Sequence, residues 1–206
     1  AGVIADKIFA ASPLIIAVIA AAPMFSNLSS FAWAKLIKGK PKVSILVWIQ
    51  TAILIFTGLI ALTPSAEDGG IWMLVTCIVI VRLLMAGQVT ARSLVWSLNY
   101  GRDVRARITG RLTIVNSLAM VLVAMGGGLL MDASPESFRW VFIAAALAGL
   151  IGVNAFSRVT VQGETEFLRA EEDASGSSAR GMWQVLQRDK KFRQYQVYQF
   201  LAGTSN

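Results

Sequence analysis

Long apolar runs separated by short polar segments dominate the chain. Each run is long enough, as a helix rising 1.5 Å per residue, to cross the roughly 30 Å hydrocarbon core of a bilayer. The pattern therefore predicts an all-α fold, a polytopic membrane helical bundle, with the beginning of a further span at 194–206. The five complete spans are expected at 13–34, 43–62, 71–95, 112–131 and 140–156.

The first span carries features that disturb a helix. Pro23 cannot donate a backbone hydrogen bond, and it predicts a kink. A polar cluster of Ser26, Asn27, Ser29 and Ser30 follows it. Such side chains most often hydrogen-bond between neighbouring helices, and Asn27 is the one that we also consider as a solute contact.

A polar stretch follows the fifth span and divides the chain. We expect an N-terminal transmembrane bundle at 1–157, a flexible linker at 158–193 and the next span at 194–206. Within the linker, GMWQVLQRDKKFRQYQ places aromatic and apolar residues among basic ones, which predicts a short interfacial helix. Because the chain starts with Ala1 and stops inside an apolar stretch, we interpret it as a fragment.

Basic residues are concentrated in alternate connections. All but three of the chain's 19 Lys and Arg residues follow the first, third or fifth span, and the exceptions are Lys7, Arg82 and Arg139. Loops rich in Lys and Arg stay in the cytoplasm during insertion. We therefore expect the N-terminal stub to lie outside the cell and residues 158–193 to lie in the cytoplasm. The membrane is expected to be a plasma membrane, specifically the inner membrane of a bacterium.

Composition excludes several classes of function. Hydrophobic residues make up 55% of the chain and charged residues only 15%, so the net charge of +7 is better explained by topology than by nucleic-acid binding. The chain has no histidine and one cysteine, Cys77. We therefore expect no metal site, no cofactor and no enzyme activity.

Arg82 is the residue that most suggests function. It lies near the middle of the third span, where an unpaired charge costs at least about 2.5 kcal/mol. It either binds an anionic group of a solute or pairs with a carboxylate, or it is a structural arginine that donates to helix carbonyls and polar side chains. The triplet Gly126, Gly127 and Gly128 is expected to allow close helix packing.

Several local motifs are similar to those of one family of membrane proteins. SSFAWAKLIKGKPK occupies the place of the family's Gly-x-Leu-Ala-Asp-Arg-x-Gly-Arg-Arg-like loop but lacks its acidic residue. VRLLMAGQVTAR is similar to the family's fourth helix, and WSLNYGRDVRARITGR to its Arg-rich run ending in Thr-Gly. SLAMVLVAMGGG keeps the glycines of the antiporter motif without its Gly-Pro, so antiport is unsupported.

These motifs resemble the major facilitator superfamily, and the resemblance implies the family's second to sixth helices, in a partial N-terminal six-helix half of that fold. It implies a secondary active or facilitated transporter working by alternating access, with a small solute and a coupling ion such as H⁺ as partners. The alternative is a non-transporting scaffold or sensor. The solute contacts would be Arg82, Asn27, Gln88 and Asn116, and the gating loop would involve Lys38, Gly39, Lys40 and Arg92.

Overall fold

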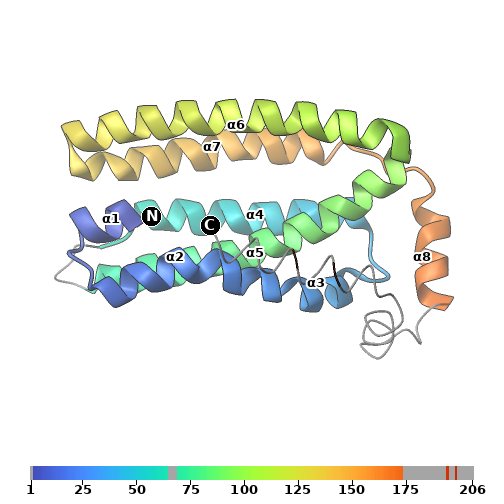
Figure 1. The fold of residues 1–206 in the computed structure, drawn as a ribbon, viewed down its shortest axis with the longest axis horizontal. Coiled ribbons are helices and arrows are strands. Elements are labelled where there is room, and N and C mark those ends of the chain that lie inside the picture. The colour runs from blue at the N-terminus through green and yellow to red at the C-terminus, as the bar shows by residue number, and fades with distance from the viewer. Residues whose placement is uncertain (1, 65–68, 174–193, 195–197, 199–206) are drawn as a thin grey trace. The chain divides into compact units, whose positions relative to one another are not determined.

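The computed structural model describes residues 2–64 and 69–173, together with the single residues Gln194 and Tyr198. Every regular element in these residues is helical (Figure 1). The elements are α1 (Gly2–Lys7), α2 (Pro13–Leu28), α3 (Ser30–Ile37), α4 (Lys42–Ala61), α5 (Gly70–Asn99), α6 (Arg102–Ala133), the 3₁₀ turn η1 (Pro135–Ser137), α7 (Phe138–Phe156) and α8 (Glu164–Asp173). The all-α bundle expected from the apolar pattern is thereby confirmed.

The helices match the length of a membrane crossing. In the described residues, α4, α5, α6 and α7 are each long and apolar enough to span a bilayer, and α2 with α3 makes a fifth span if the bent pair is counted as one. The axes of α2 and α3 meet at 44°. The chain is therefore a multi-pass membrane protein.

The helix of the first span is interrupted at Ser29, and the kink expected at Pro23 stays a prediction. α2 continues through Pro23 to Leu28. The Ser26 hydroxyl donates to the Pro23 carbonyl at 2.8 Å, and the Ser29 hydroxyl donates to the Ser26 carbonyl at 2.6 Å. Serines that bond back to their own helix often bend it. These two hydroxyls therefore bond within the first span, next to its break, and not to a neighbouring helix.

Two helices extend past the predicted spans. α5 continues to Asn99, and α6 begins at Arg102, so most of the segment expected to form an Arg-rich loop is helical. A prediction from hydropathy ends the span where charged residues begin. Arginine and alanine favour helix, however, so both helices continue into the charged segment. The α5–α6 connection is consequently only Tyr100 and Gly101.

Alternate connections of the bundle lie at opposite ends (Figure 1). One end, here called the basic end, holds the turn at 38–41, the α5–α6 connection and the segment that follows α7. The other, here called the acidic end, holds α1, Thr63–Pro64 and η1. An ion pair of 3.1 Å between Lys7 and Asp132 joins α1 to α6 at the acidic end.

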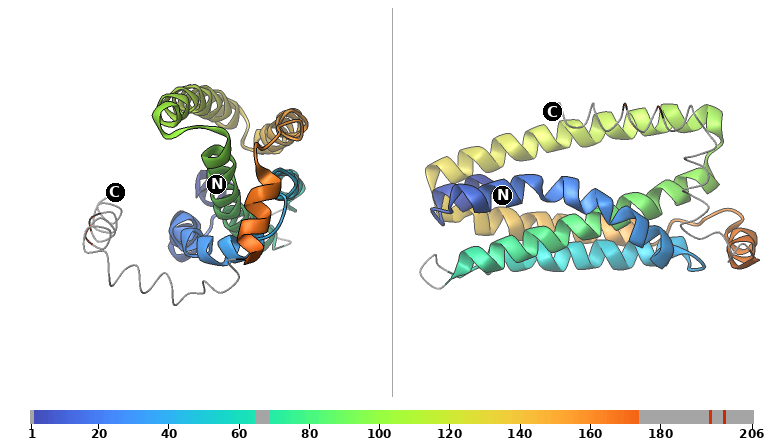
Figure 2. Two further views of the ribbon diagram at one scale, coloured as in Figure 1. Left: turned by 90° about the vertical axis from the view of Figure 1, so that its right-hand side faces the viewer. Right: turned by 60° about the horizontal axis from the view of Figure 1, so that its bottom comes forward.

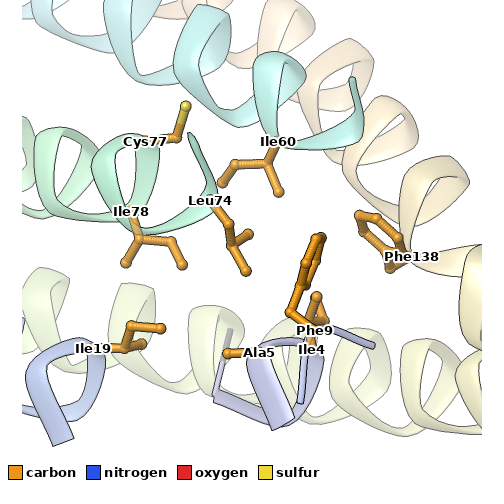
Figure 3. Packing of buried hydrophobic residues seen from close by; sticks show 9 residues of the cluster. All are labelled: Ile4, Ala5, Phe9, Ile19, Ile60, Leu74, Cys77, Ile78 and Phe138. Carbon is orange, nitrogen blue, oxygen red and sulfur yellow. The ribbon is translucent and has the colours of Figure 1, made fainter. Parts of the chain in front are cut away.

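The core is built around α4 and α5, and Figure 2 shows α6 set apart from them. At the acidic end, buried side chains from α1, α2, α4, α5 and α7 meet (Figure 3). A smaller cluster at the basic end contains Ile37, Leu46, Ala91 and Val95. No described side chain of α6 is buried.

The segment after α7 is fastened to the basic end. The Asn99 side-chain amide donates to the Thr160 carbonyl at 3.0 Å, and its oxygen accepts from the Gln162 amide at 2.9 Å. The Glu164 carboxylate accepts from the backbone amide of Lys42, the first residue of α4, at 2.6 Å. A carboxylate at this place accepts from a backbone amide that would otherwise be unpaired, and the positive end of the helix dipole stabilises its negative charge.

Part of the predicted linker is helical. α8 covers 164–173, a stretch that was expected to be flexible because it is so polar. Its Glu, Leu, Arg and Ala residues all favour helix, which a reading based on hydropathy does not register. The predicted interfacial helix and the span expected at 194–206 lie outside the described residues, apart from Gln194 and Tyr198. The division of the chain into domains therefore stays a prediction.

Candidate functional site

A pair of glutamines joins α4 to α5 in the half of the bundle nearer the basic end. The side-chain amide of Gln88 donates to the side-chain oxygen of Gln50. Both residues line a cavity of about 290 Å³ between α4, α5 and α7. The remaining wall is largely apolar and includes Leu46, Val153 and Phe156. Such an amide pair offers polar contacts to a solute without adding a charge to the cavity.

Arg92 lines the same cavity one helical turn beyond Gln88. The two residues are four positions apart on α5 and so share one face of that helix. The side chain of Arg92 is exposed, and its guanidinium lies 5.2 Å from the ring centroid of Trp96. No described carboxylate pairs with it. Arg92 therefore offers a positive charge at the edge of a cavity that contains neutral polar groups.

A second cavity, of about 420 Å³, lies between α5 and α6. Arg92 lines this cavity as well, together with Trp96, Thr113 and Asn116. The amide of Asn116 makes only a weak contact of 3.7 Å to the sulfur of Met120, within its own helix. Arg92 thus connects two cavities, one with Gln88 and one with Asn116.

The structure separates the four residues predicted to contact a solute. Gln88 and Asn116 line different cavities that share Arg92. Arg82 is half-buried on α5 and lines neither of these cavities, and it has no hydrogen-bond or ion-pair partner among the described residues. Asn27 is exposed near the end of α2 and lines neither cavity. Their roles in binding stay predictions.

Gln50 was not among the residues expected to contact a solute. Gln88 reaches it across the α4–α5 contact, and α7 supplies the rest of the cavity wall. Gln50 is a polar residue within an apolar span, but no local signal in the sequence shows that the two amides face each other.

The turn expected to act as a gating loop is short. Gly39 has φ +70°, a left-handed conformation that favours glycine. The Lys40 amide donates to the Ile37 carbonyl at 3.3 Å. The fourth residue assigned to gating, Arg92, lies on α5 and not in this turn. Nothing in the geometry tests a gating role.

Lys42 was counted only as one basic residue of a loop, but its side chain is fully buried. Its ammonium donates to the Ile37 carbonyl at 3.1 Å, where α3 ends. A buried charge is tolerated only with such polar partners. Lys42 therefore ties the end of α3 to the start of α4.

Close packing of helices depends on glycines outside the conspicuous triplet. A β-carbon at Gly87 would lie 2.5 Å from the indole of Trp33, and one at Gly149 would collide with the side chain of Leu54. Within the triplet, Gly127 has Val141 as an ordinary neighbour at 3.8 Å, and its two flanking glycines have no such neighbour within 4 Å in the described chain. The predicted packing role of the triplet stays a prediction.

The indole of Trp33 packs against α5. The indole nitrogen donates to the Leu83 carbonyl on α5 at 2.9 Å, and the ring lies against Gly87. Trp72 and Trp140, by contrast, are 65% and 74% exposed at the acidic end, where an amphipathic ring suits the membrane interface. In the described residues, no cluster of three or more metal-ligating side chains occurs.

Comparison with known proteins identifies the family. The family model of the Major Facilitator Superfamily matches residues 2–205. Neither the comparison with curated proteins nor the comparison with solved structures returned a match. The match covers nearly the whole chain, and the helices that it covers have the length and apolarity of membrane spans. The chain therefore belongs to the Major Facilitator Superfamily, and it is a transmembrane chain of the major facilitator type of transporter.

Proposed function

We propose that this protein carries a small solute with an anionic group across the membrane by alternating access, and that Arg92 contacts that group. The observation that carries the proposal is the position of Arg92, which lines both cavities and has no carboxylate partner among the described residues. An arginine is always charged and presents several donors to a carboxylate or phosphate.

Neutral polar groups beside Arg92 support a binding role. Gln88 and Gln50 lie on one side of it, and Asn116 lies on the other. Binding sites for small molecules are mostly apolar, with a few polar groups that fix the orientation of the ligand. The arrangement on α5 has this composition. A solute that enters from the basic end would first meet Arg92 there, and the positive-inside rule favours the cytoplasmic side for this end.

Transport of this kind requires no covalent chemistry. Two halves of the transporter would expose the site alternately to the two sides of the membrane. The driving force would be the gradient of the solute or of a coupling ion such as H⁺. Arg82, half-buried in the middle of α5, is a second cationic position that an anionic group would meet on its way through the bundle.

The test is transport in proteoliposomes with a panel of small carboxylates, phosphates and sulfonates. An Arg92→Gln variant loses the charge, and hydrogen bonds to charged groups contribute about 1.5–3 kcal/mol. The apparent affinity for a transported anion should therefore fall about 10- to 100-fold. Arg107→Gln is the matched control, because Arg107 is exposed on α6 and lines neither cavity.

Two results would overturn the proposal. One is a panel in which no anion is transported or competes for transport while a neutral or cationic solute is carried. The other is an Arg92→Gln variant with the affinity of the unmodified protein. An Arg82→Ala variant measured in parallel decides the separate prediction for that residue, since an unchanged rate and affinity would remove Arg82 from the solute pathway.

A further inference from the structure

A third cavity, of about 340 Å³, lies between α3, α4 and α5 at the basic end. Its wall includes Trp33, Ile49, Ala52 and Leu84, and it contains no polar side chain comparable to the glutamine pair. Trp48 lines it and is 78% exposed, so the cavity is open toward the surroundings of α4. We call it the lysine groove, because Lys40 is the one charged residue among the described residues that line it.

The lysine groove has the length of one leaflet. It extends from Lys40, in the turn before α4, to Ala52, ten residues into α4. At 1.5 Å per residue, this part of α4 covers about 15 Å, half of the roughly 30 Å hydrocarbon thickness. The lysine groove is apolar along this length and begins at a charged residue, so it matches the dimensions of a lipid acyl chain attached to a charged headgroup.

The charge at its mouth selects the headgroup. Residues 35–42 include no acidic residue, Lys35 and Lys40 are exposed while Lys42 is buried, and no described carboxylate pairs with Lys40. A zwitterionic headgroup would gain little from such a turn, whereas an anionic phosphate would be attracted to it. A water-soluble anion would gain nothing from the apolar wall. Only a molecule with both an anionic headgroup and a chain uses the whole groove.

We propose that the lysine groove binds one anionic phospholipid, with its phosphate at Lys40 and an acyl chain along Trp48 to Ala52. The positive-inside rule places this end in the cytoplasmic leaflet, where anionic lipids are available. The site is separate from the cavities that Arg92 lines, because no residue is shared between them. Bound lipid would pack between α3 and α4.

The test is tryptophan quenching in phosphatidylcholine vesicles that contain a small fraction of phosphatidylglycerol with brominated acyl chains. Bromine quenches at contact, so the fluorescence that disappears in a Trp48→Phe variant reports the groove. We expect brominated phosphatidylglycerol to quench this component at a several-fold lower fraction than brominated phosphatidylcholine does. The component assigned to Trp72, at the other end of the bundle, should show no such preference.

Two variants distinguish binding in the lysine groove from a general attraction of anionic lipid to the lysine-rich turn. Lys40→Gln and Lys35→Gln remove the same charge, but Lys35 lines no part of the groove and lies 5.1 Å from the ring centroid of Phe31. Loss of Lys40 should weaken the preference about fivefold, and loss of Lys35 should leave most of it. Ala52→Leu fills the trough without changing charge and should also reduce it.

The proposal is overturned if both brominated lipids quench Trp48 alike. It is also overturned if the two lysine variants lose the preference equally, which would indicate surface attraction only, or if Ala52→Leu keeps it in full. Unchanged circular dichroism and melting of each variant establish that the helices are intact. Inorganic phosphate at millimolar concentration should not relieve the quenching, because it lacks the chain. None of these readouts depends on transport.

Discussion

The contact between Trp33 and Gly87 allows a quantitative test of how α3 is held. A β-carbon on Gly87 would lie 2.5, 2.7 and 2.8 Å from three atoms of the indole, where ordinary contacts begin at 3.4 Å. A Gly87→Ala substitution therefore requires the ring to retreat by roughly 1 Å, since inserted carbon atoms must find room. The hydrogen bond of 2.9 Å from the indole to the Leu83 carbonyl would then be lost.

The expected cost follows from three terms. Overpacking costs about 1–3 kcal/mol, and the lost hydrogen bond about 1 kcal/mol. The higher helix propensity of alanine returns about 1 kcal/mol. We therefore expect Gly87→Ala to lower the free energy of unfolding by about 1–3 kcal/mol. Gly128→Ala, on α6, meets no neighbour within 4 Å in the described chain, and it should be neutral or more stable by up to about 1 kcal/mol.

The chain offers its own reporter for the measurement. Cys77 is its single cysteine, and it is buried in the core cluster of Figure 3. A thiol-reactive dye in mild detergent would therefore label it only as the bundle opens during a denaturant or thermal series. In a Trp33→Ala background the clash is gone, and Gly87→Ala should cease to destabilise. An equal loss of stability in both backgrounds would refute the packing argument.

Two further predictions use the same cysteine-labelling measurement. Gly149→Ala should lower the free energy of unfolding by about 1–3 kcal/mol, because its β-carbon would collide with Leu54 on α4, and Leu54→Ala should relieve most of that loss. Gly152 has open space around it, so an equal effect of Gly152→Ala would contradict this. Glu164→Gln should lower the free energy of unfolding by about 1 kcal/mol and speed hydrogen exchange of the Lys42 backbone amide, which donates to the Glu164 carboxylate. Exchange as slow as in the unmodified chain, or a similar effect of Glu166→Gln, would argue against a capping role.

The membrane spans were readable from composition, while their ends and bends were not. A segment enters hydrocarbon according to its own length and apolarity, so the five spans needed no tertiary information. The bend is different, because it depends on where a hydroxyl bonds back to a carbonyl. Pro23 stands out in the sequence, but the helix breaks at Ser29, beside two serine hydroxyls that bond back to carbonyls.

The candidate site shows the same division. Gln88, Asn116 and Arg92 were recognisable as polar or charged residues in or beside apolar spans, a property of each residue and its neighbours in sequence. That Gln88 meets Gln50, and that Arg92 borders two cavities, depends on the rotation of each helix about its axis and on the helix beside it. Partition into lipid is a local property, whereas contact between helices belongs to a pair of surfaces, and only the folded bundle brings those surfaces together.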